Sequence, residues 1–216
     1  MVFRLGMLGM ALWMLLAACA ARPTLRADGV ILEDDFSNPR SGWDTYTGID
    51  LITTYDNGRY LIAVETPNRD AFGLAGLDLN DMQISVEAQA SGGPQDNAFG
   101  VLCRHTRSGD RNNFYFFLIS SDGYYAVGKV VNQTERTFLN PAKNFEPLQA
   151  IKTGNGALNR LEAICQGKRL SFTVNGVAAG SFEDETLTHG DVGLIAGTFN
   201  EGGVRIHFDN VVVRQP

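Results

Sequence analysis

The chain has 216 residues, of which 44% are hydrophobic and 19% are charged, and its formal net charge is −6. These values are typical of one globular domain with a sizeable core, and they exclude an intrinsically disordered chain. No run of Lys or Arg is present to neutralise phosphates, which argues against nucleic acid as a partner.

Residues 1–18 have the layout of a secretory signal peptide: one arginine, an apolar stretch and small residues at the end. The sequence Leu16-Ala17-Ala18-Cys19 then resembles the lipobox of bacterial lipoproteins. The resemblance implies cleavage before Cys19, lipidation of its thiol and an extracytoplasmic, lipid-anchored protein of the bacterial cell envelope. The alternative is an ordinary signal peptide cut after Ala18 or Ala20, which leaves a free thiol.

Short β-rich runs fill the rest of the chain. Residues 19–29 lack periodicity and are expected to form a flexible tether, so the folded domain is predicted to span residues 30–216. The predicted strands are Val30–Phe36, Trp43–Thr47, Ile49–Tyr55, Arg59–Glu65, Phe72–Leu77, Met82–Ala90, Phe99–His105, Phe114–Ile119, Tyr124–Val130, Thr134–Leu139, Leu161–Cys165, Leu170–Val174, Val177–Phe182, Asp191–Phe199 and Val204–Val213. This pattern, without a convincing helix, predicts an all-β domain, an antiparallel β-sandwich of the jelly-roll type.

The stretch Asn97–Val130 is the clearest element. Three runs rich in Phe, Tyr, Val and Ile are separated by Ser-Gly-Asp and Ser-Ser-Asp-Gly, which are turn signals. We therefore predict a three-stranded antiparallel meander at the centre of a sheet. In Phe114–Ile119 both alternating faces are apolar, so this strand is either covered on both sides or lines a groove with one face.

The chain contains three cysteines, Cys19, Cys103 and Cys165. If Cys19 carries lipid, an even pair remains in an oxidising compartment. Cys103 and Cys165 are then expected to form a disulfide that closes a long loop. The alternative is a pair of buried thiols that act as small hydrophobic side chains.

Several segments together carry a family resemblance. They are Asp35-Phe36, Ser41-Gly42-Trp43, Asn159–Glu162, Leu170–Gly176, Gly190–Leu194 and Phe208–Val211. In this order they resemble the concanavalin A-like lectin/glucanase superfamily, closest to its laminin G-like and 3-keto-disaccharide hydrolase-like branches in bacterial envelope proteins. The resemblance covers residues 30–213 and implies a concanavalin A-like sandwich. It leaves the function open, because this fold hosts lectins, glycosidases and adhesion modules.

No catalytic constellation is evident in the sequence. The laminarinase-like branch carries its acids as Glu-x-Asp-x-x-Glu on one strand, and the chain lacks this pattern. The acidic runs Glu183–Glu185 and Glu33–Asp35 consist of consecutive residues, whose side chains alternate in direction, and are typical of solvated turns. His105, His189 and His207 belong to no nucleophile or zinc-site motif. Binding is therefore favoured over catalysis.

Candidate ligand-binding residues are aromatic and cationic side chains on turns and on the meander. Trp43 and Tyr46 lie in a turn-rich segment, and Arg104, Tyr115 and Tyr125 lie on the meander. Sugars stack on aromatic rings and are held by a few polar groups, so we expect Arg104, Tyr115 and Tyr125 to line a groove. The head of Arg104 is expected to point to solvent. For each ring the alternative is packing in the core.

Related sandwiches often hold a structural calcium ion near the paired chain ends, and Asp35, Asp209 and Asn210 offer oxygen ligands for it. The alternative is that Asp209-Asn210 ends or bulges the last strand; no other cofactor is expected. The leading function is an envelope-anchored, non-catalytic module that recognises a carbohydrate or another envelope ligand. The alternatives are a glycoside hydrolase-related enzyme and a structural or protein-interaction module.

Overall fold

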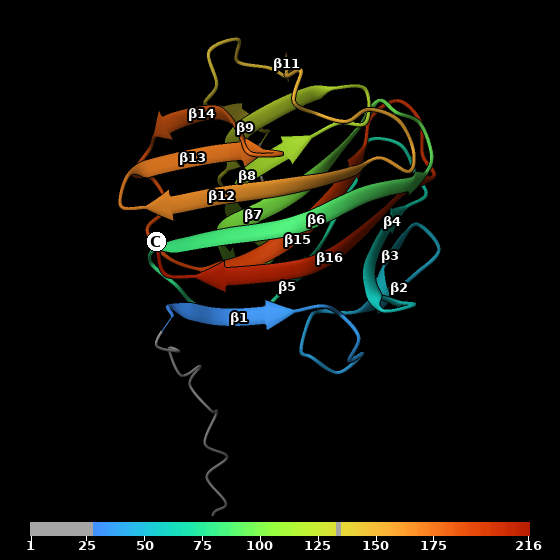
Figure 1. The fold of residues 1–216 in the computed structure, drawn as a ribbon, viewed down its shortest axis with the longest axis horizontal. Coiled ribbons are helices and arrows are strands. Elements are labelled where there is room, and N and C mark those ends of the chain that lie inside the picture. Colours follow the sequence, from blue (N-terminus) through green and yellow to red (C-terminus); the bar gives the residue numbers. More distant parts are fainter. Residues whose placement is uncertain (1–27, 133–134) are drawn as a thin grey trace, which may run out of the picture.

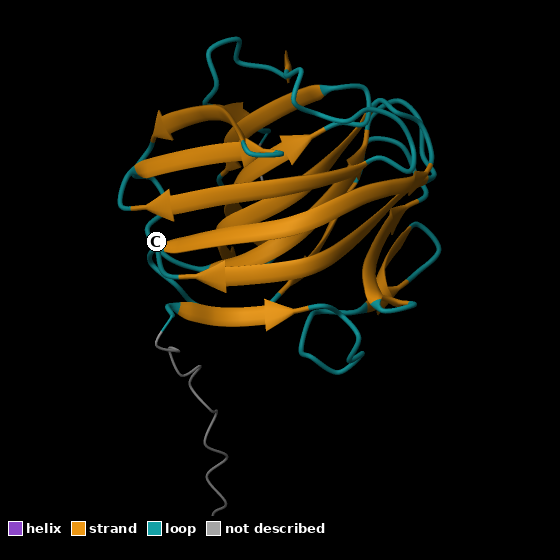
Figure 2. Cartoon of the chain, viewed as in Figure 1, coloured by secondary structure: helices purple, strands orange, loops and turns teal. Residues whose placement is uncertain are grey.

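The computed structural model describes residues 28–132 and 135–216. The strands are β1 (Val30–Asp34), β2 (Tyr46–Thr47), β3 (Leu51–Asp56), β4 (Arg59–Val64), β5 (Asp70–Leu74), β6 (Met82–Gly92), β7 (Asn97–Ser108), β8 (Arg111–Ile119), β9 (Tyr124–Val130), β10 (Thr137–Phe138), β11 (Glu146–Pro147), β12 (Leu158–Gln166), β13 (Arg169–Val174), β14 (Val177–Glu183), β15 (Asp191–Thr198) and β16 (Val204–Arg214). None of the described residues belongs to a helix long and apolar enough to cross a membrane. The predicted all-β class is confirmed (Figure 2).

The strands form two antiparallel sheets packed face to face, so the predicted β-sandwich is confirmed. The nine-stranded sheet has the order β14-β13-β12-β6-β16-β4-β3-β2, with β1 paired to β16. The seven-stranded sheet has the order β10-β9-β8-β7-β15-β5, with β11 paired to β9. In Figure 1, strands β6, β12 and β16 of the first sheet lie in front of β7, β8 and β15 of the second.

The meander predicted in Asn97–Val130 forms β7, β8 and β9, which are successive neighbours in the seven-stranded sheet. The Asn-Gly pairs at Asn57-Gly58 and Asn175-Gly176 both adopt positive φ, as a two-residue hairpin turn requires. They join β3 to β4 and β13 to β14. Turn chemistry and alternation together therefore explain most of the strand order along the chain.

Two predicted strands are much shorter than expected. Of Trp43–Thr47 only β2 is a strand, because Trp43 turns into the core and packs on Phe36 with 5.5 Å between ring centroids. Of Thr134–Leu139, the described residues form a strand only at β10. Strand β11 was not predicted; its proline and its length of two residues provide no β signal.

The main core lies between the sheets. Alternation along β8 directs Tyr115, Phe117 and Ile119 into it. Phe117 packs on Phe172 of β13 in the opposite sheet, with 5.7 Å between ring centroids. Burial of a side chain of this size stabilises the fold by about 1.5–3 kcal/mol. These contacts hold the two sheets together along the middle of β8.

The opposite face of β8 is also buried. Phe114, Phe116 and Leu118 belong to a second hydrophobic cluster, on the outer face of the seven-stranded sheet. The segment 136–147, which we call the cover segment, pairs with β9 through β10 and β11 and packs Phe138 on Phe116 at 5.8 Å between ring centroids. Of the two predicted arrangements for this strand, the structure shows coverage on both sides.

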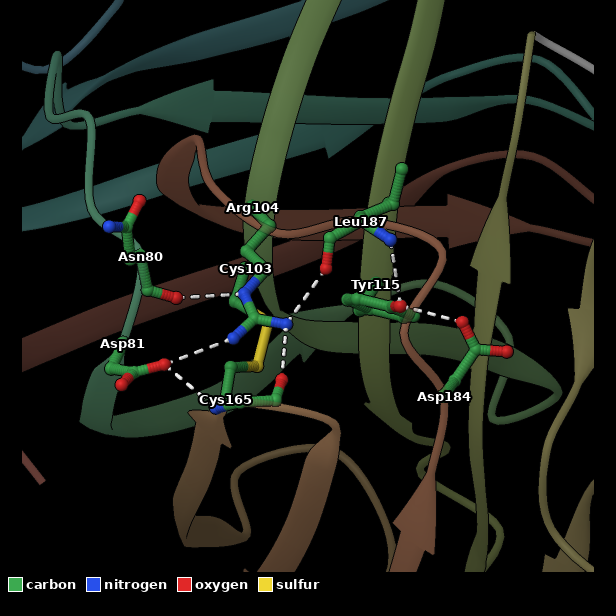
Figure 3. The surroundings of a disulfide bond; sticks show 9 residues. Asn80, Asp81, Cys103, Arg104, Tyr115, Cys165, Asp184 and Leu187 are labelled. Carbon is green, nitrogen blue, oxygen red and sulfur yellow. Dashed lines mark hydrogen bonds and ion pairs between the residues drawn. A yellow bond between two sulfur atoms is a disulfide. The ribbon is translucent and has the colours of Figure 1, made fainter.

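A disulfide joins the two sheets. Cys103 of β7 is bonded to Cys165 of β12, and the two residues are 0% and 1% exposed (Figure 3). The predicted pairing is therefore confirmed. Because structural disulfides form in oxidising compartments, the bond indicates an extracytoplasmic location.

Arg104, next to this disulfide, is an interior residue with 1% exposure. Its guanidinium donates hydrogen bonds of 2.8 Å to the carbonyls of Asn80, Gly167 and Leu187, and contacts Asp81 Oδ1 at 3.2 Å (Figure 3). The expected solvent position of its head is wrong. A bulge in β7, with φ of +54° at Arg104, shifts the alternation and turns the side chain inward.

Tyr115 belongs to a neighbouring polar network that also links the sheets. Its hydroxyl donates to Asp184 Oδ1 at 2.6 Å and accepts from the Leu187 amide at 3.0 Å. Lys129 Nζ donates to Asp184 Oδ2 at 2.5 Å. Burial by itself would raise the pKa of Asp184, but hydrogen bonds from Lys129, Tyr115 and Thr186 outweigh it and hold the pKa well below the usual range. The ionised carboxylate thus ties the end of β14 to β8 and β9.

Removing the disulfide is expected to destabilise the domain strongly. The cross-link spans 62 residues of sequence, and restricting a loop of that length in the unfolded chain contributes on the order of 4 kcal/mol. Urea unfolding of the wild type and of Cys103→Ala/Cys165→Ala measures the difference. Under reducing conditions, the wild type should have a urea midpoint close to that of the double variant. Equal midpoints for all samples would refute a stabilising role.

The Asp184 network makes stability depend on pH. Because the folded pKa lies below the unfolded value near 3.9, this stability is complete above that value and is lost as pH falls through the folded pKa. Between pH 5 and pH 2, Asp184→Asn should therefore lose less unfolding free energy than the wild type, although it is less stable at pH 7. The neighbouring exposed substitution Glu185→Gln is the control, and parallel pH profiles for wild type and Asp184→Asn would contradict the prediction.

Candidate functional site

The structure does not gather the predicted ligand-binding residues into one groove. Arg104 and Tyr115 are 1% and 0% exposed, and Trp43 and Tyr125 are 4% and 6% exposed. Trp43, Tyr115 and Tyr125 pack within the main core. Tyr46 is 60% exposed and is the one predicted residue whose ring faces solvent.

The outer face of the seven-stranded sheet has an apolar centre. Its buried residues include Leu102, Phe116, Leu118 and Ile195. Strands β7, β8 and β9 contain no Asp or Glu, and β15 has only Asp191, at its first position. Glycoside hydrolysis normally requires two carboxylates on either side of the sugar. The centre of this face therefore lacks the groups for that reaction.

Cavities open at the two ends of the same face. The larger one, about 800 Å³, lies beside the end of β7, the start of β15 and the β2–β3 hairpin; we call it the Tyr46 cleft. It is lined by Asp44, Thr45, Tyr46, Leu51, Thr53, Asp70, Ala71, Phe72, Leu74, Leu77, Asp78, His105, Thr106, Arg107, His189, Gly190 and Asp191. The smaller one, about 440 Å³, lies at the opposite end, where β8 ends and β9 begins.

Rings form one wall of the Tyr46 cleft. Phe72 of β5 contacts His105 and Phe114, with ring centroids 5.2 and 5.9 Å apart. His105 Nε2 lies 3.0 Å from Asn112 Oδ1, which fixes the plane of the imidazole. Burial lowers the pKa of His105, so this ring is neutral at pH 7. The wall is thus largely apolar and carries no fixed charge.

Asp44 and Arg107 supply polar groups at the rim. Both are exposed, and within the described part of the chain neither side chain has a hydrogen-bond or salt-bridge partner. The backbone of Asp44 is nevertheless fixed, because its amide donates to the Leu74 carbonyl at 3.1 Å and its carbonyl accepts from the Tyr60 hydroxyl. A well-placed carboxylate and a guanidinium therefore remain available to a ligand.

The other three carboxylates of the cleft are already engaged. Asp70 pairs with Arg136 at 2.6 Å, and Asp78 pairs with His189 at 2.7 Å. Asp191 accepts hydrogen bonds from backbone amides, among them those of Gly76 and Leu77 at 2.9 and 2.8 Å. Burial raises the pKa of Asp191, and these amides oppose the rise. Asp191 holds the loop after β5 in place and thereby shapes the cleft.

Two of the three predicted calcium ligands line a third cavity. Asp35 and Asn210 border a space of about 420 Å³ together with Asp34, whereas Asp209 does not border it. Asp34 Oδ2 is buried and has no hydrogen-bond partner in residues 28–132 and 135–216.

This oxygen-rich lining suits calcium. However, no three His, Cys, Asp or Glu side chains of the described residues are grouped as a metal site would require. Asp209 and Asn210 form a bulge in β16, with φ of +52° at Asn210, as the alternative interpretation held.

Sequence reasoning missed Asp44 and Arg107. Asp44 is adjacent to Trp43 and close to Tyr46, so the turn-rich aromatic segment did contain a signal. Arg107 follows the bulge in β7. A bulge changes which face the following side chains occupy, and no sequence pattern predicts this change. These two residues become recognisable only when β5, β7 and the β2–β3 hairpin are placed together.

No family model and no curated protein matches this chain. Solved structures do match. The carbohydrate-binding module CBM66 from Bacillus subtilis is 15% identical over 81% of this chain and 96% of its own, with a TM-score of 0.63. A protein of unknown function with a galectin-like fold, also from Bacillus subtilis, is 10% identical over 87% of this chain and 96% of its own, with a TM-score of 0.63.

A β-glucanase from Bacillus licheniformis is 10% identical over 88% of this chain and 100% of its own, with a TM-score of 0.58. Identities this low establish the fold and leave the activity open. The chain therefore has the concanavalin A-like lectin/glucanase fold, which carbohydrate-binding modules and glycoside hydrolases share.

Proposed function

We propose that this domain is a non-catalytic carbohydrate-binding module that binds its ligand in the Tyr46 cleft. The observation that carries the proposal is the exposed ring of Tyr46 in a cleft with the unpaired Asp44 and Arg107. A sugar can stack on the ring, while its hydroxyls donate to the carboxylate and accept from the guanidinium. The concanavalin A-like fold, which carbohydrate-binding modules share, is consistent with this function.

The hydrolase alternative has less support. A hydrolase would need a general acid and a second carboxylate on the other side of the sugar. In the Tyr46 cleft, Asp70 and Asp78 are in ion pairs and Asp191 accepts hydrogen bonds from backbone amides. Of the four carboxylates that line this cleft, Asp44 is therefore the one that is not engaged. The third alternative, a protein-interaction module, would be favoured by a flat face, and the presence of a cleft of this size counts against it.

We also propose that the module is tethered to the cell envelope by a lipid on Cys19. This residue lies outside the described residues, so the support is the lipobox-like sequence Leu16–Cys19 together with the disulfide, which indicates an oxidising compartment. A tether followed by a rigid binding domain suits a protein that captures a glycan near the membrane.

The proposal is tested with soluble protein comprising residues 20–216. A glycan screen, run with calcium and with a chelator, identifies the ligand, and titration calorimetry then compares the wild type with Tyr46→Ala, Asp44→Ala and Arg107→Ala. Each substitution should weaken binding by about fivefold or more, because one such contact contributes around 1 kcal/mol. No release of reducing ends is expected on prolonged incubation.

Ile49→Ala is the matched control, because Ile49 is 93% exposed in the segment between β2 and β3 but does not line the cleft. It should bind like the wild type. Unchanged affinity in all three cleft variants would refute the site. Ligand hydrolysis that disappears in Asp44→Asn would instead favour the enzyme.

A further inference from the structure

We propose that the smaller cavity, at the opposite end of the same face, is a second saccharide site, selective for sugar units without an acidic group. The proposal rests on the proposed function for its ligand class but not for its location. The cavity, which we call the Tyr124 bowl, combines the rings of Tyr124, Phe145 and Phe199 with the amides of Asn68, Asn144 and Asn200. None of these residues borders the Tyr46 cleft.

The rings provide an apolar surface within the bowl. Phe145 of the cover segment packs on Phe199, which follows β15, with 5.6 Å between ring centroids. Tyr124, at the start of β9, is 40% exposed. Aromatic rings in a shallow polar cavity suit the C–H face of a sugar ring, which is apolar while its edges carry hydroxyls.

The amides provide hydrogen-bonding groups at the edge. Asn68 and Asn200 are exposed, and within the described chain their side chains have no hydrogen-bond partner. Asn144 Oδ1 accepts from the Phe145 amide at 2.8 Å, and its Nδ2 group has no hydrogen-bond partner among the described residues. Each unpaired amide offers both a donor and an acceptor, the combination that a sugar hydroxyl requires.

The charge of the bowl determines which sugars it accepts. Asp96 and Asp122 line it, and no Lys, Arg or His does. A carboxylate or sulfate on a sugar would be repelled by both side chains and would find no cation to pair with. The Tyr46 cleft differs, because Arg107 and His189 line it beside its carboxylates. The bowl is therefore selective against acidic sugars.

Buried polar side chains hold the loops of the bowl in place. Asn97 is 0% exposed; it accepts from the Ser121 amide at 3.0 Å and donates to the Pro94 carbonyl at 2.7 Å, which links the turns that carry Asp122 and Asp96. This anchoring fixes one half of the rim independently of any ligand.

The other half of the rim of the Tyr124 bowl is also held by buried polar side chains. Asn140 is 0% exposed and donates to the Asn144 carbonyl at 2.6 Å. Thr198 is 4% exposed and donates to the Thr66 carbonyl at 2.7 Å, beside the loop that carries Asn68. Loops that are ordered before binding lose little conformational entropy when a ligand arrives. The bowl thus has the rigidity of a formed site.

The test is an NMR titration of ¹⁵N-labelled protein comprising residues 20–216. The probes are glucose, galactose, fructose and N-acetylglucosamine, with glucuronate as the acidic probe, each at millimolar concentration. We expect at least one neutral sugar to shift the amide signals of Asn68, Tyr124 and Asn200, and glucuronate to leave them in place. Asn200→Ala should weaken that response about fivefold or more, whereas Tyr46→Ala should leave it unchanged.

The outcomes separate this proposal from the preceding one. Shifts confined to Asp44, Tyr46 and Arg107 would overturn the second site and keep the first. Shifts at the bowl with glucuronate as strong as those with neutral sugars would overturn the charge selectivity. If no sugar moves either set of signals, the bowl is refuted as a saccharide site, and the glycan screen decides the Tyr46 cleft separately.

Discussion

The architecture of this domain depends on one constraint: both faces of β8 are apolar. A strand of this kind is stable only if apolar groups pack on both of its sides, because exposing either face would leave several large side chains in water. The nine-stranded sheet covers the face that carries Phe117. The cover segment provides the apolar contacts on the other face, where Phe138 packs on Phe116.

This constraint also determines where a ligand can bind. The middle of the outer face is filled by hydrophobic side chains, and the two cavities described on this face lie toward its two ends. Each end combines aromatic rings with polar side chains, drawn from strand ends and from the loops that follow them. Both proposed sites therefore lie away from the strand centres, where residues can change without disturbing the core.

The strand pattern of this chain follows from local rules, and several features could therefore be predicted from the sequence. Alternation predicted two apolar faces for Phe114–Ile119, and turn signals predicted the meander in Asn97–Val130. The Cys103–Cys165 pairing followed from counting cysteines in an oxidising compartment. Each of these inferences depends on neighbours in the chain or on composition, and none of them requires knowledge of which strands pair.

The site was harder to predict, because it depends on register and on distant contacts. The bulge in β7 reverses the direction of Arg104, and no residue type near it signals the change. Tyr46 was recognised because it lies in a turn-rich segment. Asp44 is held beside β5, and Arg107 lies on β7; both strands pair with β15, an arrangement that single-sequence patterns do not encode.

The cover segment has a further consequence, for the self-association of the protein. Without it, β9 would be the edge of the seven-stranded sheet, with a row of free amides and carbonyls that another chain could extend. β10 and β11 pair with the two ends of β9, and between them Asn140 Oδ1 accepts a hydrogen bond from the Val127 amide of β9 at 3.4 Å. A foreign strand therefore finds no long continuous edge here, so neighbouring copies are kept from joining sheet to sheet along β9.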